Sequence, residues 1–106
     1  MTDFTLQSLA DLIDDRATSV RNASYTRNLL DAGTEKCAKK FGEEAIELVI
    51  AGVGSDKKAI ILESADVLYH LLVVLQVNGI ALQDVMVELQ RRTAQSGIEE
   101  KASRKS

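Results

Sequence analysis

The sequence predicts an all-α fold built from four main antiparallel helices and one short connector helix. Three observations support this fold class. The chain of 106 residues contains no proline, the residue that interrupts helices. Apolar residues recur every three or four positions through most of the chain, as they do along one face of a helix. The β-branched residues fall within these helical periods, so signals for strands are weak.

The length fits a single domain covering residues 1–106. Because a chain this short has a limited buried volume, we expect help from a partner chain. A net charge of −3 and a pI near 5.1 argue against a nucleic-acid partner. The one cysteine cannot form an internal disulfide, and no basic-then-apolar leader is visible. We therefore expect a cytoplasmic protein.

The first helix is expected over residues 4–20, and its apolar side is assigned to packing alone. Residues 21–33 predict a connector with one short helix, with Ser24 as its N-cap and Gly33 as its stop. Three side chains of this connector, Arg21, Tyr25 and Arg27, either face a phosphate or form solvated surface.

The second helix is expected from Thr34, acting as its N-cap, to about residue 53. One charged stripe runs along it, with apolar stripes on both flanks, so the charged stripe is expected to lie in a groove. The stripe contains Lys36, Lys40, Glu43 and Glu47, with Glu44 at its edge. The two lysines either pair with the glutamates one turn away or bind phosphate.

The third helix is expected to begin after Ser55, as its cap, and to end at Gly79. Its second half, residues 67–75, is apolar on nearly every side, but it is shorter than the roughly 20 residues that cross a membrane. A helix that is apolar all round must be covered on every side, so we predict a homodimer and no membrane partner.

A fourth helix is expected around Leu82, Val85, Met86 and Leu89. Ala81 stands near its N-cap position and offers no side-chain acceptor, while Arg91 and Arg92 suit the negative end of the helix dipole. Residues 95–106 are expected to be a polar tail.

Two acidic pairs, Glu44 with Glu47 and Glu63 with Asp66, are each spaced three residues apart and so lie on one helix face. If the two helices lie side by side and antiparallel, the four carboxylates converge. Two like charges 4 Å apart repel by roughly 4 kcal/mol at an effective dielectric near 20, so such a cluster calls for protons or cations. Oxygen ligands suit Mg²⁺, which often also binds substrate phosphates. The alternative is two ordinary acidic faces in water.

The residues that follow the second acidic pair are open to two interpretations. His70 lies one turn after Asp66, where it either orients a ligand and touches substrate or is a hydrogen-bonded core histidine. Tyr69 is open to the same two interpretations.

Several segments of the chain resemble phosphoribosyl-ATP pyrophosphohydrolase of histidine biosynthesis. They are Ser24-Tyr25-Thr26, Lys36, Lys40-Phe41-Gly42-Glu43-Glu44-Ala45-Ile46-Glu47, Glu63-Ser64-Ala65-Asp66-Val67-Leu68-Tyr69-His70, and the tail from Gln95 to Lys101. The resemblance covers about residues 5–104. The two acidic pairs alone are shared with the wider all-α nucleoside triphosphate pyrophosphohydrolases of the MazG and dimeric dUTPase type.

The resemblance implies a MazG-like bundle completed by homodimerisation. It also implies the second step of histidine biosynthesis, in which phosphoribosyl-ATP and water give phosphoribosyl-AMP and pyrophosphate. The implied metal ligands and catalytic residues, with Mg²⁺ as cofactor, are Glu44, Glu47, Glu63 and Asp66. The implied or candidate substrate-binding residues are Lys36, Lys40, Tyr25, Glu43 and His70.

Two other functions stay open at this point. One is a house-cleaning pyrophosphohydrolase that acts on a simple NTP or dNTP through the same metal site but with a different base pocket. The other is a helical dimer without enzymatic activity that serves as a protein-interaction module.

Overall fold

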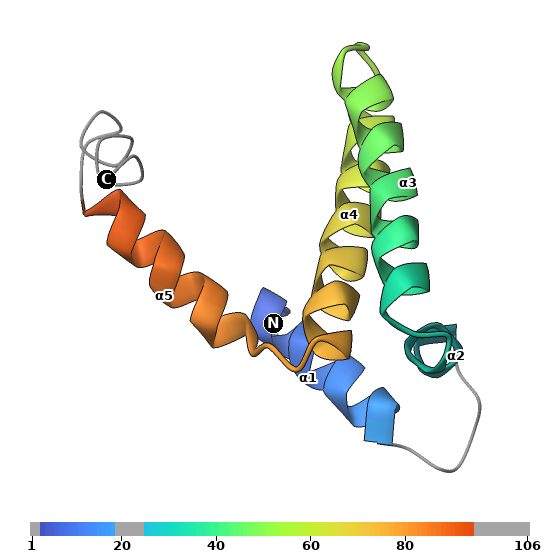
Figure 1. Ribbon diagram of the computed structural model, residues 1–106. Helices are drawn as coiled ribbons and strands as arrows, with labels where there is room; N and C mark the ends of the chain where they lie inside the picture. Colours follow the sequence, from blue (N-terminus) through green and yellow to red (C-terminus); the bar gives the residue numbers. More distant parts are fainter. Residues whose placement is uncertain (1–2, 19–24, 95–106) are drawn as a thin grey trace, which may run out of the picture.

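The computed structural model describes residues 3–18 and 25–94, and within these ranges the chain forms helices and no strands (Figure 1). The all-α fold class is therefore confirmed. The helices are α1 (Leu6–Thr18), α2 (Tyr25–Asp31), α3 (Thr34–Gly52), α4 (Lys57–Val77) and α5 (Leu82–Thr93). The expectations for Arg21, for the Ser24 cap and for the tail over 95–106 concern positions outside the described residues.

Helices α3 and α4 form a long antiparallel hairpin, the arrangement in which the two acidic pairs can converge (Figure 1). Helices α1 and α2 pack at the end of the hairpin opposite its turn, where α2 contacts both hairpin helices. The buried core lies at this end, and each helix contributes to it: Ile13, Leu29, Cys37, Leu72, Val73 and Leu82. The hairpin is thus anchored at one end, and its two helices hold the acidic pairs at mid-length.

The cap of α4 differs from the sequence-based prediction. Asp56, not Ser55, is the N-cap, and its carboxylate accepts hydrogen bonds from the backbone N–H groups of Lys58 and Ala59 at 3.0 and 3.2 Å. Asp and Ser are comparable N-cap residues, so their order in the sequence could not choose between them. The predicted Thr34 cap is also wrong, because Gly33 is the N-cap of α3 and no side chain caps that helix.

The end of α4 agrees with the expected stop at Gly79. Gly79 has φ +68°, the left-handed conformation that glycine adopts without steric penalty. The N–H of Ile80 donates to the Leu75 carbonyl at 2.9 Å, and that of Gly79 donates to the Gln76 carbonyl at 3.1 Å. These two bonds form a Schellman motif, which satisfies carbonyls that the helix leaves free.

We expect Asp56→Ala to lower the free energy of unfolding by about 1 kcal/mol, because two backbone N–H groups lose their acceptor. At constant protein concentration, thermal unfolding followed by circular dichroism should show a Tm lower by about 4–8 °C. Ser55→Ala is the matched control and should leave Tm nearly unchanged. If Ser55→Ala lowered Tm and Asp56→Ala did not, Ser55 would be the N-cap of α4.

Helix α5 leaves the hairpin at an angle (Figure 1), and Leu82 at its start is its one buried residue. Ala81 is its N-cap and makes no side-chain cap, as the sequence predicts. Near the other end, the Glu88 carboxylate accepts from Arg91 at 2.7 Å and from Arg92 at 2.9 Å. These hydrogen bonds, first from Arg91 and then from Arg92, lower the pKa of Glu88 to about 2. The last turn of α5 is therefore held by local ion pairs.

Large apolar side chains are exposed along the hairpin and on α5. They are Ile46, Val49, Ile50, Val53, Ile61, Leu62, Leu68, Met86, Val87 and Leu89. Over its full 21 residues, α4 is long and apolar enough to cross a membrane by length and composition, a test that core helices of soluble proteins also pass. Residues 67–75 are thus part of a longer apolar helix, and the absence of a membrane partner stays a prediction.

Candidate metal and phosphate site

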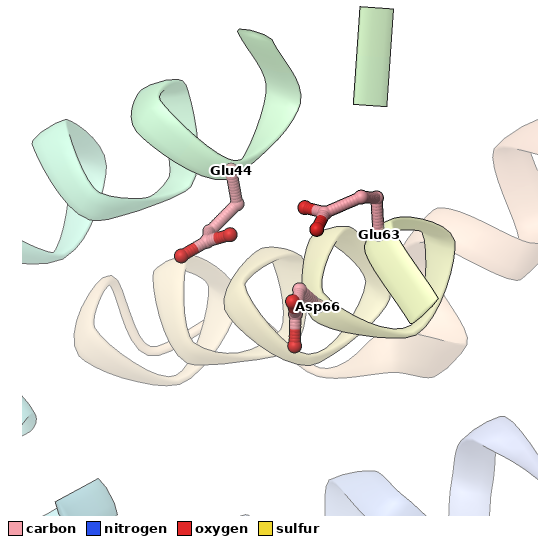
Figure 2. Close-up of side chains that lie close together, drawn as sticks. All are labelled: Glu44, Glu63 and Asp66. Atoms are coloured by element: carbon pink, nitrogen blue, oxygen red, sulfur yellow. The ribbon is translucent and has the colours of Figure 1, made fainter. Parts of the chain in front are cut away.

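Three of the four predicted carboxylates come together between α3 and α4. One oxygen from each of Glu44, Glu63 and Asp66 lies within 4.8 Å of the others. Glu44 projects from α3 toward the other two residues, which α4 supplies (Figure 2). The antiparallel hairpin thus brings side chains about twenty positions apart into one acidic cluster.

The cluster is enclosed on one side and open on the other. Only 12% of the Glu44 side chain is exposed, whereas Asp66 is exposed. One oxygen of Glu63, Oε2, is buried and has no hydrogen-bond partner among the described residues. A buried carboxylate oxygen without a partner is unfavourable unless a cation or proton satisfies it. The three residues therefore fit a hard divalent cation that keeps open positions for water or phosphate.

Glu47 lies beside this cluster and not within the group of three oxygens. Its side chain is exposed and lies close enough to that of Glu44 for the two carboxyl groups to hydrogen-bond when one of them is protonated. This hydrogen bond, together with the charges of Glu44 and Glu63, raises the pKa of Glu47, and the same bond lowers the pKa of Glu44. The two carboxyl groups thus form an interacting acid pair, in which the pKa of Glu47 lies above and that of Glu44 below the usual glutamate value.

Of the two candidate lysines, Lys40 reaches the cluster. Its Nζ lies 3.5 Å from a Glu44 oxygen and 3.7 Å from a Glu43 oxygen, and Glu43 itself is largely exposed. Lys36 is exposed, and no ion pair joins it to the cluster within the described part of the chain. The structure therefore brings one lysine to the carboxylates and leaves the other one turn away.

His70 is 5% exposed, and its Nδ1 atom is buried without a hydrogen-bond partner among the described residues. Burial lowers the pKa of His70, while the nearby charges of Glu44 and Asp66 act in the opposite direction. The imidazole is therefore neutral near pH 7. Among the described residues its Nδ1 has no hydrogen-bond partner, so the choice between a core histidine and a substrate contact stays a prediction.

Tyr25 joins this group from α2. Its ring meets that of His70 edge-on at a centroid distance of 6.2 Å, and more than half of the residue is exposed. Its electrostatic interaction with Lys40 is the largest of several effects that raise the pKa of that lysine. Tyr25 therefore stands at the rim of the site, on the side where Lys40 lies. Arg27 is two residues further along α2 and pairs with Asp31, one turn later, at 3.6 Å.

An added Cβ at Gly42 would meet no atom of residues 3–18 or 25–94 within 4 Å, so packing in this part of the chain does not require glycine there. Close contact between helices of one chain is thus not the reason for this residue.

A family model described as phosphoribosyl-ATP pyrophosphohydrolase matches residues 6–93. The chain belongs to this family. The match includes the three clustered carboxylates, Glu47 and both candidate lysines, and it confirms the resemblance based on the sequence motifs.

Full-length relatives agree with the family assignment. A phosphoribosyl-ATP pyrophosphatase 1 of Bradyrhizobium diazoefficiens is 56% identical over 105 residues, 99% of each chain. A phosphoribosyl-ATP pyrophosphatase of Rhizobium meliloti is 54% identical over 106 residues, covering 100% of this chain and 99% of its own. Another, of Azorhizobium caulinodans, is 57% identical over 100 residues, 94% of this chain and 92% of its own.

Proposed function

We propose that this chain hydrolyses phosphoribosyl-ATP to phosphoribosyl-AMP and pyrophosphate in histidine biosynthesis, using Mg²⁺ at the acidic cluster. In this reaction water adds to a phosphorus atom, and the bond that links the leaving pyrophosphate to the nucleotide breaks. Family membership and the names of relatives more than 50% identical over their length support the assignment. The activity belongs to the hydrolases that act on phosphoric anhydrides.

The observation that carries this proposal is the convergence of Glu44, Glu63 and Asp66 around a buried Glu63 oxygen that has no partner among the described residues. We assign these three residues as metal ligands, and Glu47 as the fourth. When bound, the cation would neutralise phosphate charge and lower the pKa of the attacking water. Lys40, held 3.5 Å from Glu44, places a positive charge where the phosphates would lie. Tyr25 and His70 are proposed to contact the substrate beside Lys40, with Glu43 orienting that lysine and Lys36 meeting more distant phosphate oxygens.

The experiment that tests the proposal compares pyrophosphate release from phosphoribosyl-ATP, dUTP, dCTP and ATP, each with and without Mg²⁺. We expect turnover that requires Mg²⁺ and a kcat/KM for phosphoribosyl-ATP at least about a hundredfold above the others, since polar recognition of a larger substrate discriminates strongly. Preference for a simple NTP would support the house-cleaning function instead. No Mg²⁺-dependent turnover of any nucleotide would contradict the proposed activity.

We also propose that the protein is a cytoplasmic homodimer. The exposed apolar side chains of α3, α4 and α5 are the observation that favours a second copy. A second copy of the chain would cover the apolar side chains of α3 and α4 that are exposed in the single chain.

A further inference from the structure

Tyr69 links the short helix α2 to the proposed site. Its hydroxyl hydrogen-bonds to that of Thr26, which is 1% exposed, and the bond joins residues 43 positions apart. A buried hydroxyl that loses its partner is costly, so this bond favours one placement of α2 on α4.

The Tyr69 ring also contacts both aromatic residues of the site. It meets the His70 ring edge-on, with centroids 5.0 Å apart and an interplanar angle of 89°. It stacks with Tyr25 at 6.3 Å and 29°. Aromatic pairs in these geometries attract one another beyond their buried area. One side chain thus orders Thr26, Tyr25 and His70.

Helix α2 has a second attachment at its other end. Leu29 is buried in the core, and the buried thiol of Cys37 donates to the Leu29 carbonyl at 3.2 Å. This attachment lies away from Tyr25, at the far end of a seven-residue helix. The Thr26–Tyr69 bond is therefore the contact placed to set the position of Tyr25.

We propose that Thr26 and Tyr69 form a positioning pair, whose hydroxyl–hydroxyl bond holds the first turn of α2 so that Tyr25 stays beside His70 and Lys40 to bind substrate. This inference rests on the proposed function. In this role neither member of the pair needs to touch substrate. Their effect passes through Tyr25, so they act on substrate binding and not on the bond-breaking step.

Removing either hydroxyl tests the pair. Tyr69→Phe keeps the ring, and Thr26→Val keeps the shape of the side chain. We expect each to raise KM for phosphoribosyl-ATP by about three- to tenfold with kcat changed less than about twofold, as loss of one positioning hydrogen bond predicts. Thr26→Ser, which retains a hydroxyl, should restore KM. An unchanged KM in Tyr69→Phe, even with a lower Tm, would overturn the proposal.

Cys37→Ala is the matched control, because it weakens the other attachment of α2. We expect it to lower Tm while KM stays near that of the wild type. If Cys37→Ala raised KM as much as Tyr69→Phe did, general loosening of α2 would explain both results, and the specific role of the pair would be lost.

A double-mutant cycle separates action through Tyr25 from an independent effect. Tyr25→Ala should raise KM, and adding Tyr69→Phe to it should change KM no further. If Tyr69→Phe raised KM in the Tyr25→Ala background by the same factor as in the wild type, the proposal would be overturned.

A binding measurement keeps the inference testable if phosphoribosyl-ATP is not the substrate. The probe is pyrophosphate with Mg²⁺, titrated by calorimetry. The sequence contains two tyrosines and no tryptophan, so the tyrosine fluorescence of the Tyr69→Phe variant comes from Tyr25 alone. This fluorescence gives a second measurement of pyrophosphate binding. We expect Tyr69→Phe to weaken this binding by about threefold or more. Failure of the proposed function appears as an inactive wild type, whereas failure of the positioning role appears as equal affinities.

Discussion

Glu63→Gln is expected to lower kcat by at least about a hundredfold while the helical circular dichroism spectrum stays unchanged. The substitution removes the negative charge of Glu63, whose buried oxygen has no partner within the described ranges, at the proposed metal site. Steady-state pyrophosphate release at saturating Mg²⁺ measures the effect. Glu47→Gln should also remove most of the turnover. Its loss of kcat should be smaller than that of Glu63→Gln, because Glu47 is exposed and lies outside the group of three oxygens.

The stability of the same variant distinguishes a functional carboxylate from a structural one. Without metal, Glu63→Gln removes one of three clustered negative charges, so Tm should stay constant or rise. With Mg²⁺, the wild type should gain stability through binding and the variant should gain less. Glu35→Gln is the control, since Glu35 lies in the first turn of α3 away from the cluster. A lower Tm for Glu63→Gln without metal, together with full activity, would contradict the site.

The arrangement of helices was predictable because it depends on spacing. A three-residue interval places two carboxylates on one helix face, and the Gly-rich turn after α3 leaves an antiparallel hairpin as the simplest connection. These two facts favoured convergence of the two acidic pairs, and in the structure Glu44 meets the pair on α4. They did not fix side-chain rotamers, which leave Glu47 at the margin of the cluster.

The N-cap residues were predicted wrongly where neighbouring residues are similarly suited to cap a helix. Ser55 and Asp56 are both good N-cap residues, and only the backbone path chooses Asp56. At α3 the helix begins one residue earlier than a Thr34 cap allows, because Gly33 takes up the N-cap position with φ 100°.

The contact between Thr26 and Tyr69 could not be predicted from the sequence, because it joins a short connector to the middle of α4. No periodicity relates these positions, and both residues are also common in packed interfaces. The tertiary fold alone brings the two hydroxyls together. The sequence left the roles of Tyr25, Tyr69 and His70 open, and in the structure the Tyr69 ring contacts the other two.

The second large effect that we expect concerns assembly. Ile50→Asp should convert the protein from a dimer to a monomer at micromolar concentration. The Ile50 side chain lies on α3 beside other exposed apolar residues and is 66% exposed in the single chain. Within one chain a charge at this position meets water, so it carries little penalty. In a dimer that covers this face the same carboxylate would be buried without a partner, which is strongly unfavourable.

Sedimentation measures the change directly. The wild type should sediment as twice the chain mass of 11.6 kDa, and Ile50→Asp as a single chain. Asn28→Asp makes the same change in charge at an exposed polar position of α2 and should remain a dimer. A monomeric wild type would contradict the proposed homodimer, and a dimeric Ile50→Asp would place the interface elsewhere. The apolar residues on α5 would then be the next surface to test, since α5 diverges from the hairpin and buries only Leu82.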